Sequence, residues 1–191
     1  MKKILTGVLG LICLLSILPA SAVELAKVTI PDQINQAGSD TRLVLNGAGI
    51  RYKFVFKIYI GALYLPEKTT QAEEVLSSTG PKRILMHFLY DRVAKKDLDK
   101  AWLEGFSANH DDEVLAKLEG RINRFAGLFS DVVEGDVIWL DQIPGEGTRI
   151  YFNGELKETI PGADFYQALL RIWIGGEPVT SGLKRAMLGQ E

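Results

Sequence analysis

The chain is 191 residues long and carries 22 basic and 24 acidic side chains, so it is slightly acidic overall. This balance argues against nucleic acid or a broad anionic surface as the partner, because such partners are bound by a surplus of Lys and Arg. The chain has one cysteine, Cys13, and two histidines. A disulfide framework and a cysteine-based metal centre are therefore excluded.

Residues 1–22 have the three-part pattern of a secretory signal peptide. Two lysines precede an uncharged apolar run, residues 4–18, and a small-residue cleavage site ends at Ala22. The run is shorter than the ~20 residues that span a bilayer, so we predict a cleaved signal rather than an uncleaved anchor. Losing the two lysines leaves 20 basic against 24 acidic side chains, a net charge of −4. We expect a mature single domain, residues 23–191, in a bacterial periplasm, with no transmembrane segment.

Residues 41–65 give the strongest strand signal, because the run is rich in aromatic and β-branched residues. Even-numbered apolar residues from Tyr52 to Ile60 alternate with odd-numbered residues that include Arg51 and Tyr59. Period-two alternation predicts that the even set forms a core face and that the odd set forms a mixed face.

The remaining elements come in clusters of strands and clusters of helices. A short strand is expected at residues 28–30 and an interior, nearly all-apolar strand at 82–90. Helical periodicity and capping residues predict helices over residues 71–78, 97–108, 111–129, 163–174 and 180–188. A C-terminal meander with an Asn-Gly turn is expected over residues 136–141, 148–152 and 155–160. This order predicts an α+β fold with a large, mainly antiparallel sheet and helices packed on one face.

Several kinds of site are absent from the sequence. No metal-ligand spacing joins His87 to His110, and there is no acidic calcium loop, Gly-x-Ser-x-Gly motif or dinucleotide fingerprint. We therefore expect neither a metal nor a cofactor. His87 lies inside an expected strand and is interpreted as structural. His110 lies beside two aspartates in a connection, where we expect it to be solvated.

Arg51 is the strongest remaining candidate for chemistry. It follows Gly47-Ala48-Gly49, where the missing Cβ atoms allow the backbone to approach a neighbour closely. Its planar, permanently charged guanidinium suits a carboxylate or a phenolate, and Tyr59 lies on the same expected face. An edge-strand arginine in water, with a tyrosine packed beside it, explains these residues equally well.

Two motifs resemble the chalcone isomerase family. They are LNGAGIR at residues 45–51, followed by KIYIGALYL at 57–65, and FYQALLRIWIG at 165–175. The sequence looks most like the exported bacterial branch of that family, over roughly residues 24–189. The resemblance implies an open-faced β-sandwich, in which a large antiparallel sheet has helices on one face and short strands on the other. It also implies a ligand cleft between the sheet and the helices.

The plant enzymes of this family close a chalcone to a flavanone by intramolecular oxyanion addition. The resemblance implies that Arg51 corresponds to their motif arginine. Their other polar catalytic positions fall on residues that are mainly apolar or small here: Tyr59, Leu98, Ala101, Gly105 and Ile172. These replacements argue against hydrogen-bonding catalysis of that reaction.

A non-catalytic branch of the family binds fatty acids, with an arginine and a strand tyrosine on the carboxylate and the tail in an apolar cleft. Arg51 and Tyr59 fit this pattern better than that of the enzyme. In a straight strand, however, eight residues would separate them by about 26 Å. A shared carboxylate therefore requires a tight bend, and no Gly or Pro marks one.

Three hypotheses follow. The favoured one is an exported, non-catalytic binder of a fatty acid or similar apolar anion, with Arg51 and Tyr59 as the ligand-binding residues. The second is an isomerase or intramolecular lyase for a phenolic or enone, with Arg51 stabilising the oxyanion and Tyr59 donating a proton. The third is a protein-interaction module with a vestigial cleft, marked by an outward Arg51 and a cleft filled by Trp102, Phe106 and Trp173.

Overall fold

The computed structural model describes residues 22–36 and 41–190. The signal-peptide prediction falls outside the described residues, apart from Ala22 in the first strand. The strands are β1 (Ala22–Leu25), β2 (Val28–Pro31), β3 (Gln33–Asn35), β4 (Arg42–Lys53), β5 (Phe56–Leu65), β6 (Lys82–Phe88), β7 (Arg92–Val93), β8 (Val132–Val133), β9 (Val137–Ile143), β10 (Gly147–Phe152) and β11 (Glu155–Pro161). The helices are α1 (Ala72–Ser77), α2 (Lys95–Asn109), α3 (Asp112–Ala126), α4 (Ala163–Ile174) and α5 (Ser181–Met187).

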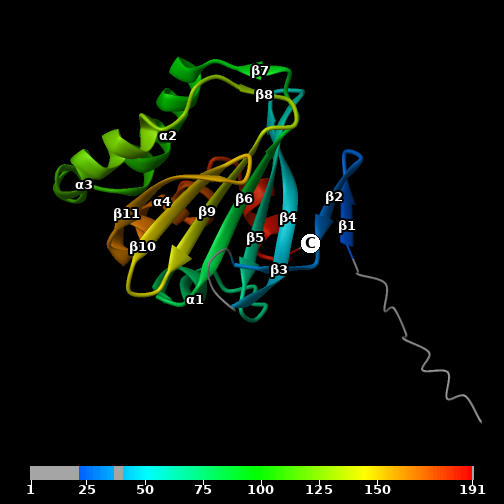
Figure 1. Cartoon of the computed structure of the whole chain (residues 1–191), viewed down its shortest axis with the longest axis horizontal. Helices are drawn as coiled ribbons and strands as arrows, with labels where there is room; N and C mark the ends of the chain where they lie inside the picture. Colours follow the sequence, from blue (N-terminus) through cyan, green and yellow to red (C-terminus); the bar gives the residue numbers. More distant parts are fainter. Residues whose placement is uncertain (1–21, 37–40, 191) are drawn as a thin grey trace, which may run out of the picture.

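Seven strands form one antiparallel sheet in the order β11-β10-β9-β6-β5-β4-β3 (Figure 1). Strand β6 lies between β5 and β9, as its apolar sequence predicts. The turn from β10 to β11 holds Asn153 and Gly154 at positive φ, as expected for an Asn-Gly hairpin. The predicted helices are all present, and the α+β class with an antiparallel sheet is confirmed.

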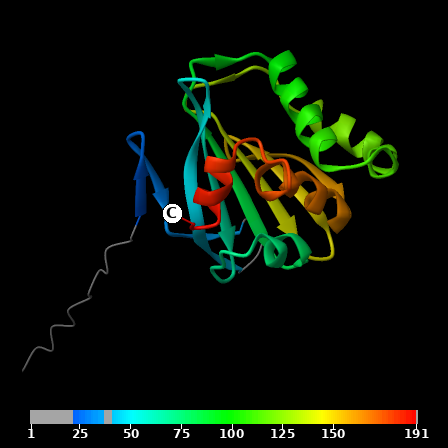
Figure 2. The same cartoon turned by 180° about the vertical axis from the view of Figure 1, so that it is seen from behind.

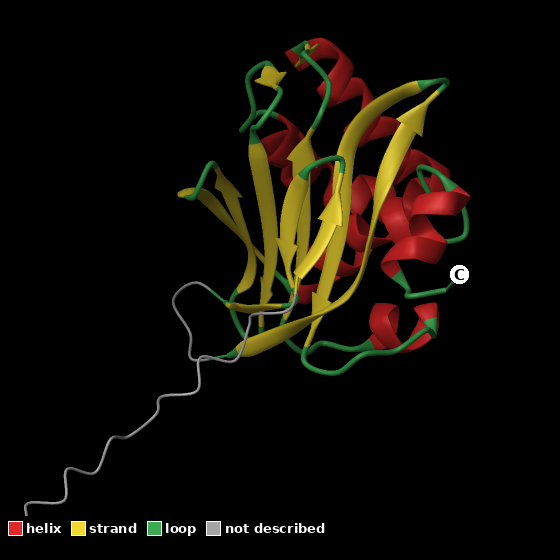
Figure 3. Cartoon of the chain, turned by 90° about the vertical axis from the view of Figure 1, so that its right-hand side faces the viewer, coloured by secondary structure: helices red, strands yellow, loops and turns green. Residues whose placement is uncertain are grey.

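The helices cover one face of the sheet, and the β1-β2 hairpin lies against the other (Figures 2 and 3). Side chains of β5 alternate between these two layers. Leu63 and Leu65 join the larger core beneath the helices, whereas Ile60 and Tyr64 join a smaller core beneath the hairpin. The Tyr64 hydroxyl also donates to the Pro31 carbonyl oxygen at 2.9 Å. This arrangement confirms the open-faced sandwich and explains why β5 is apolar on both faces.

Helix α5 packs directly on β4, and two glycines make the close approach possible. A Cβ at Gly47 would lie 2.9 Å from backbone atoms of Met187 and Gly189. A Cβ at Gly49 would lie 2.5 Å from the Ala186 side chain. The close backbone approach expected at this motif is therefore present, but the neighbour is a helix of the same chain.

Strands β4 and β5 form a hairpin that closes at a two-residue turn, Phe54-Val55. Arg51 pairs directly with Tyr59 across the hairpin. The assumption of one straight strand, which would separate these two residues by about 26 Å, is therefore wrong. Phe54 has a φ of 55°, a left-handed conformation that Gly or Asn usually adopts. Because the turn contains neither Gly nor Asn, the sequence did not predict it.

The core face predicted for residues 52–60 is also wrong near the turn. Tyr52, Phe54 and Phe56 are exposed, whereas Ile60 is fully buried. The turn reverses the chain, and the pairing register shifts between Arg51 and the following residue. A single period-two alternation therefore cannot describe this segment.

A candidate ligand-binding pocket

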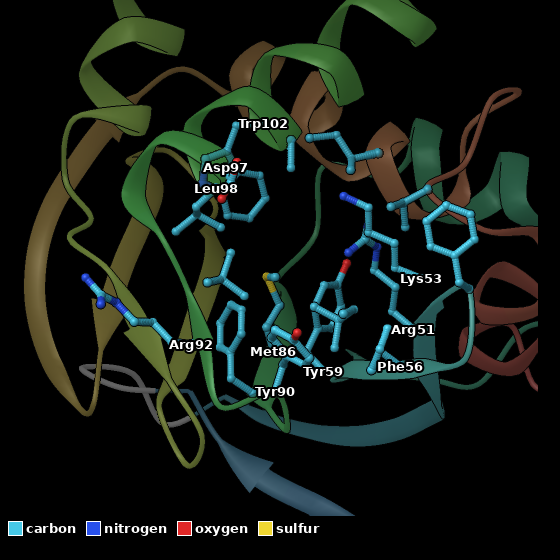
Figure 4. A pocket seen from close by; sticks show the side chains of 17 residues that line it. Arg51, Lys53, Phe56, Tyr59, Met86, Tyr90, Arg92, Asp97, Leu98 and Trp102 are labelled. Atoms are coloured by element: carbon cyan, nitrogen blue, oxygen red, sulfur yellow. The ribbon is translucent and has the colours of Figure 1, made fainter.

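A cavity of about 320 Å³ lies between one end of the sheet and helices α2 and α4 (Figure 4). The ends of β4, β5 and β6 form one wall, and residues of α2, α4 and the segment before α5 form the other. The buried part of its lining is mostly apolar or aromatic and consists of Ile58, Tyr59, Met86, Phe88, Leu98, Trp102 and Ile172. The cleft predicted between the sheet and the helices is thus present in the structure.

Arg51 lies on β4 and lines this cavity. Its guanidinium carbon is 5.6 Å from the centroid of the Tyr59 ring, which is a cation–π distance. Its Nε atom is buried and has no hydrogen-bond acceptor among the described residues, and Arg51 forms no ion pair with them. A buried donor without an acceptor is costly, and the charge of Arg51 is not neutralised by any described residue.

Tyr59 lies opposite Arg51 on β5 and is 5% exposed. The two side chains extend into the cavity beside one another (Figure 4). The indole Nε1 of Trp173 donates to the Tyr59 hydroxyl oxygen at 3.0 Å. Because indole only donates, the phenolic proton stays available for a ligand oxygen. Burial raises the pKa of Tyr59, an effect that Arg51 opposes more weakly, so the phenol is neutral near neutral pH.

Trp102 supplies a second buried donor that sequence reasoning missed. The Trp102 side chain lines the cavity and is only 3% exposed. Its Nε1 has no acceptor among the described residues. Ring contacts with Phe125, Phe129 and Trp173 hold the indole in place. From the sequence alone, Trp102 is expected only as a side chain that could fill a vestigial cleft, and no pattern in a sequence indicates that an indole N–H will lack an acceptor.

The exposed part of the lining is more basic than acidic. Lys53 and Arg92 contribute positive charge, and Asp97 contributes one negative charge. Arg92 also forms an ion pair with Asp131, at the surface. Together with Arg51, these residues give the cavity a positive electrostatic bias.

The positions that the resemblance matched to polar catalytic residues of the plant enzymes lie around this cavity. Leu98, Ala101 and Ile172 line it. A Cβ at Gly105 would lie 2.9 Å from the Ile172 side chain, so this glycine allows α2 and α4 to pack closely. The expectation that the cleft is apolar at these places is therefore correct.

A vestigial cleft would have an outward Arg51 and a volume filled by side chains, and neither feature is observed. Arg51 lines the cavity rather than pointing outward, and about 320 Å³ remains open. Trp102 forms part of the wall, while Phe106 and Trp173 are buried in the core of the helical layer.

Neither histidine lines this cavity. His87 lies in β6 and burial lowers its pKa, which fits a structural role. The expectation that His110 is solvated is wrong, because the ring is half-buried and its Nε2 lies 3.1 Å from the Ala168 carbonyl oxygen. Within residues 22–36 and 41–190, no cluster of potential metal ligands occurs and no helix is long and apolar enough to cross a membrane.

The fold and the cavity define a class of protein, an open-faced β-sandwich with an apolar pocket between its sheet and its helices. The chain belongs to the chalcone isomerase-like family, whose sequence profile matches residues 22–189. Among solved structures it is similar to the fatty-acid binding protein AtFAP1 of Arabidopsis thaliana. The TM-score is 0.65 and the identity 16%, over 88% of this chain and 96% of that chain. At this identity the likeness shows the fold. No curated protein matches the chain.

Proposed function

We propose that this protein binds a fatty acid or a similar apolar anion, with the carboxylate at Arg51 and the hydrocarbon tail in the apolar part of the pocket. The observation that carries the proposal is Arg51, which has a buried, unpaired Nε and lies in a cavity whose buried lining is apolar or aromatic. The cavity volume falls within the range of about 300–1,000 Å³ that is typical of small-molecule sites.

The chemistry of the lining supports an amphiphilic ligand. Arg51, the Tyr59 hydroxyl and Trp102 Nε1 are donors, and none of them has an acceptor within the described residues. A carboxylate offers about four acceptor positions on two oxygens, so it can accept from several donors at once. The fold is shared with AtFAP1, whose name describes a fatty-acid binding protein.

Binding is better supported than catalysis. An isomerase would need a proton donor, but burial raises the pKa of Tyr59 and makes its phenol a weaker acid. Leu98, Ala101 and Ile172 bring no further titratable group to the wall. An intramolecular lyase would therefore depend mainly on Arg51 for charge stabilisation, because Lys53 and Arg92 lie in the exposed part of the lining.

We further propose that binding takes place after export to the periplasm, because residues 1–22 carry the pattern of a signal peptide. The intact mass of the protein from a periplasmic extract tests this. A mature chain that begins at Val23 is expected, and a mass that retains residues 1–22 would contradict cleavage.

Calorimetric titration with palmitate and with its methyl ester tests the proposed ligand class. Palmitate is expected to bind at least about tenfold more tightly, because charge-assisted hydrogen bonds are roughly twice as strong as neutral ones. The two compounds share the same tail, so their difference isolates the contribution of the anion. Equal affinities would mean that the pocket recognises only apolar surface.

A further inference from the structure

The tip of the β4-β5 hairpin exposes an unusual amount of apolar surface. Phe54 is 91% exposed and Val55 is 82% exposed, and Tyr52 and Phe56 beside them are about half exposed. Tyr90 adds another exposed ring, whose centroid is 5.7 Å from that of Phe56. These residues form a tip cluster that consists of Tyr52, Phe54, Val55, Phe56 and Tyr90. Most of the large apolar side chains that are exposed within the described residues belong to it. Such a concentration indicates an interaction site rather than random exposure.

The conformation of the turn is also not explained by packing. Phe54 has a φ of 55°, which is costly for a bulky residue, and Gly or Asn would relieve the strain. Because its side chain is 91% exposed, burial within the molecule does not compensate for this cost. The turn holds an aromatic ring out into solvent.

The same tip is basic. Lys53 and Lys57 are exposed on either side of the turn and form no ion pair with described residues. The chain as a whole carries a net charge of −2, so the positive charge of the tip is local. Aromatic rings interleaved with lysines are typical of segments that enter the headgroup region of an anionic bilayer.

We propose that the β4-β5 tip docks on an anionic lipid membrane, with Phe54 and Val55 inserted and Lys53 and Lys57 on the headgroups. The tip adjoins the pocket, because Lys53, Phe54 and Phe56 also line the cavity. Docking therefore brings the pocket entrance to the lipid, where a fatty acid can enter or leave. The transfer of ligand rests on the proposed function, whereas docking itself does not.

A membrane fits this surface better than a protein partner does. The apex is a two-residue turn, too small for the roughly 1,000 Å² that a stable protein interface buries. In a symmetric contact between two copies, Lys53 and Lys57 would face like charges. Anionic headgroups, in contrast, complement both lysines, and a fluid bilayer accommodates protruding rings without a shaped groove.

Vesicle flotation tests the proposal with the double variant Val55→Asp, Lys57→Glu, neither of whose residues lines the pocket. We expect the wild type to float with phosphatidylcholine/phosphatidylglycerol vesicles and less with phosphatidylcholine alone, and binding to weaken with salt. The variant should lose at least about tenfold in partitioning, since each basic residue near an anionic surface contributes about a fivefold preference. Leu156→Asp with Lys117→Glu is the matched control, because both residues are exposed elsewhere and the partitioning should not change.

Equal flotation of the wild type and the tip variant, or no flotation of the wild type, would overturn the proposal. So would a dimer in sedimentation that the tip variant abolishes, because the tip would then be an interface between copies of the chain. Palmitate titration of the tip variant separates the two proposals. Unchanged affinity with lost flotation supports docking, whereas flotation without any palmitate binding refutes the proposed function alone.

Discussion

Replacing Arg51 with glutamine is expected to weaken palmitate binding by about 2–4 kcal/mol, which is about 30- to 700-fold. Arg51 is the half-buried cation of the lining, whereas Lys53 and Arg92 are exposed, and its Nε is buried without an acceptor in the described part of the chain. Glutamine keeps a hydrogen-bond donor but removes the charge. The carboxylate of the ligand would then be desolvated without a counter-ion, which is the most costly outcome for a buried anion.

Titration calorimetry of three variants measures this effect. Arg42→Gln is the matched control, because Arg42 lies on the same strand, is exposed and does not line the pocket. Its affinity should equal that of the wild type. Tyr59→Phe should lose only about 0.5–1.5 kcal/mol, as expected for one hydrogen bond. If Arg51→Gln binds palmitate within about twofold of Arg42→Gln, the arginine is not the anchor.

The second large effect concerns stability. Gly47→Ala is expected to lower the free energy of unfolding by about 3 kcal/mol, at the upper end of overpacking effects. The new Cβ would press on the Ala186 carbonyl oxygen of α5, and it would lie only 2.9 Å from backbone atoms of Met187 and of Gly189, which follows the helix. Backbone cannot move aside as a flexible side chain does. The helix would have to separate from β4 and break the bond from Asn46 Nδ2 to the Met187 carbonyl oxygen.

Urea unfolding of Gly47→Ala and of Gly120→Ala checks this prediction. Gly120 lies inside α3 and is exposed, and a Cβ added there would meet no other atom within 4 Å. Alanine there should stabilise the protein by about 0.5–1 kcal/mol, through the better helix propensity of alanine. Equal stabilities of the two variants would show that α5 does not rest on Gly47 in solution.

Much of the fold could be predicted because local patterns and burial agree along most of the chain. The apolar run of β6, the Asn-Gly turn and the amphipathic helices each indicate one structure, and the sheet uses them in that way. Two helices begin where the sequence predicts a cap: the Asp111 side chain accepts from the Val114 amide, and the Thr180 side chain accepts from the Leu183 amide.

The β4-β5 turn could not be predicted, because its residues oppose the conformation that they adopt. Phe54 and Val55 are strand formers, and Phe54 takes a left-handed φ of 55° without any glycine. This one error misplaced Tyr59 relative to Arg51 and assigned the exposed tip to the core. Errors of this kind are expected where function rather than folding selects the residue.

The pocket itself was foreseen only in part. Arg51 stood out because it follows Gly47-Ala48-Gly49 and carries a planar, permanent charge, and because the resemblance matched it to the motif arginine of the family. The unpaired donor of Trp102 and the bond from Trp173 to Tyr59 depend on contacts between distant segments. Such contacts can be read only from the folded chain.

The most direct test of the central claim is carbon-13 NMR of carboxyl-labelled palmitate bound to the protein, followed as the pH is lowered. A guanidinium beside the carboxylate favours the charged form and lowers its pKa. We expect one carboxyl resonance for bound palmitate. The carboxyl group should have a lower pKa when the ligand is bound to the wild type than when it is bound to Arg51→Gln. A bound carboxyl that titrates at the same pH in both proteins would contradict the anchoring of the ligand by Arg51.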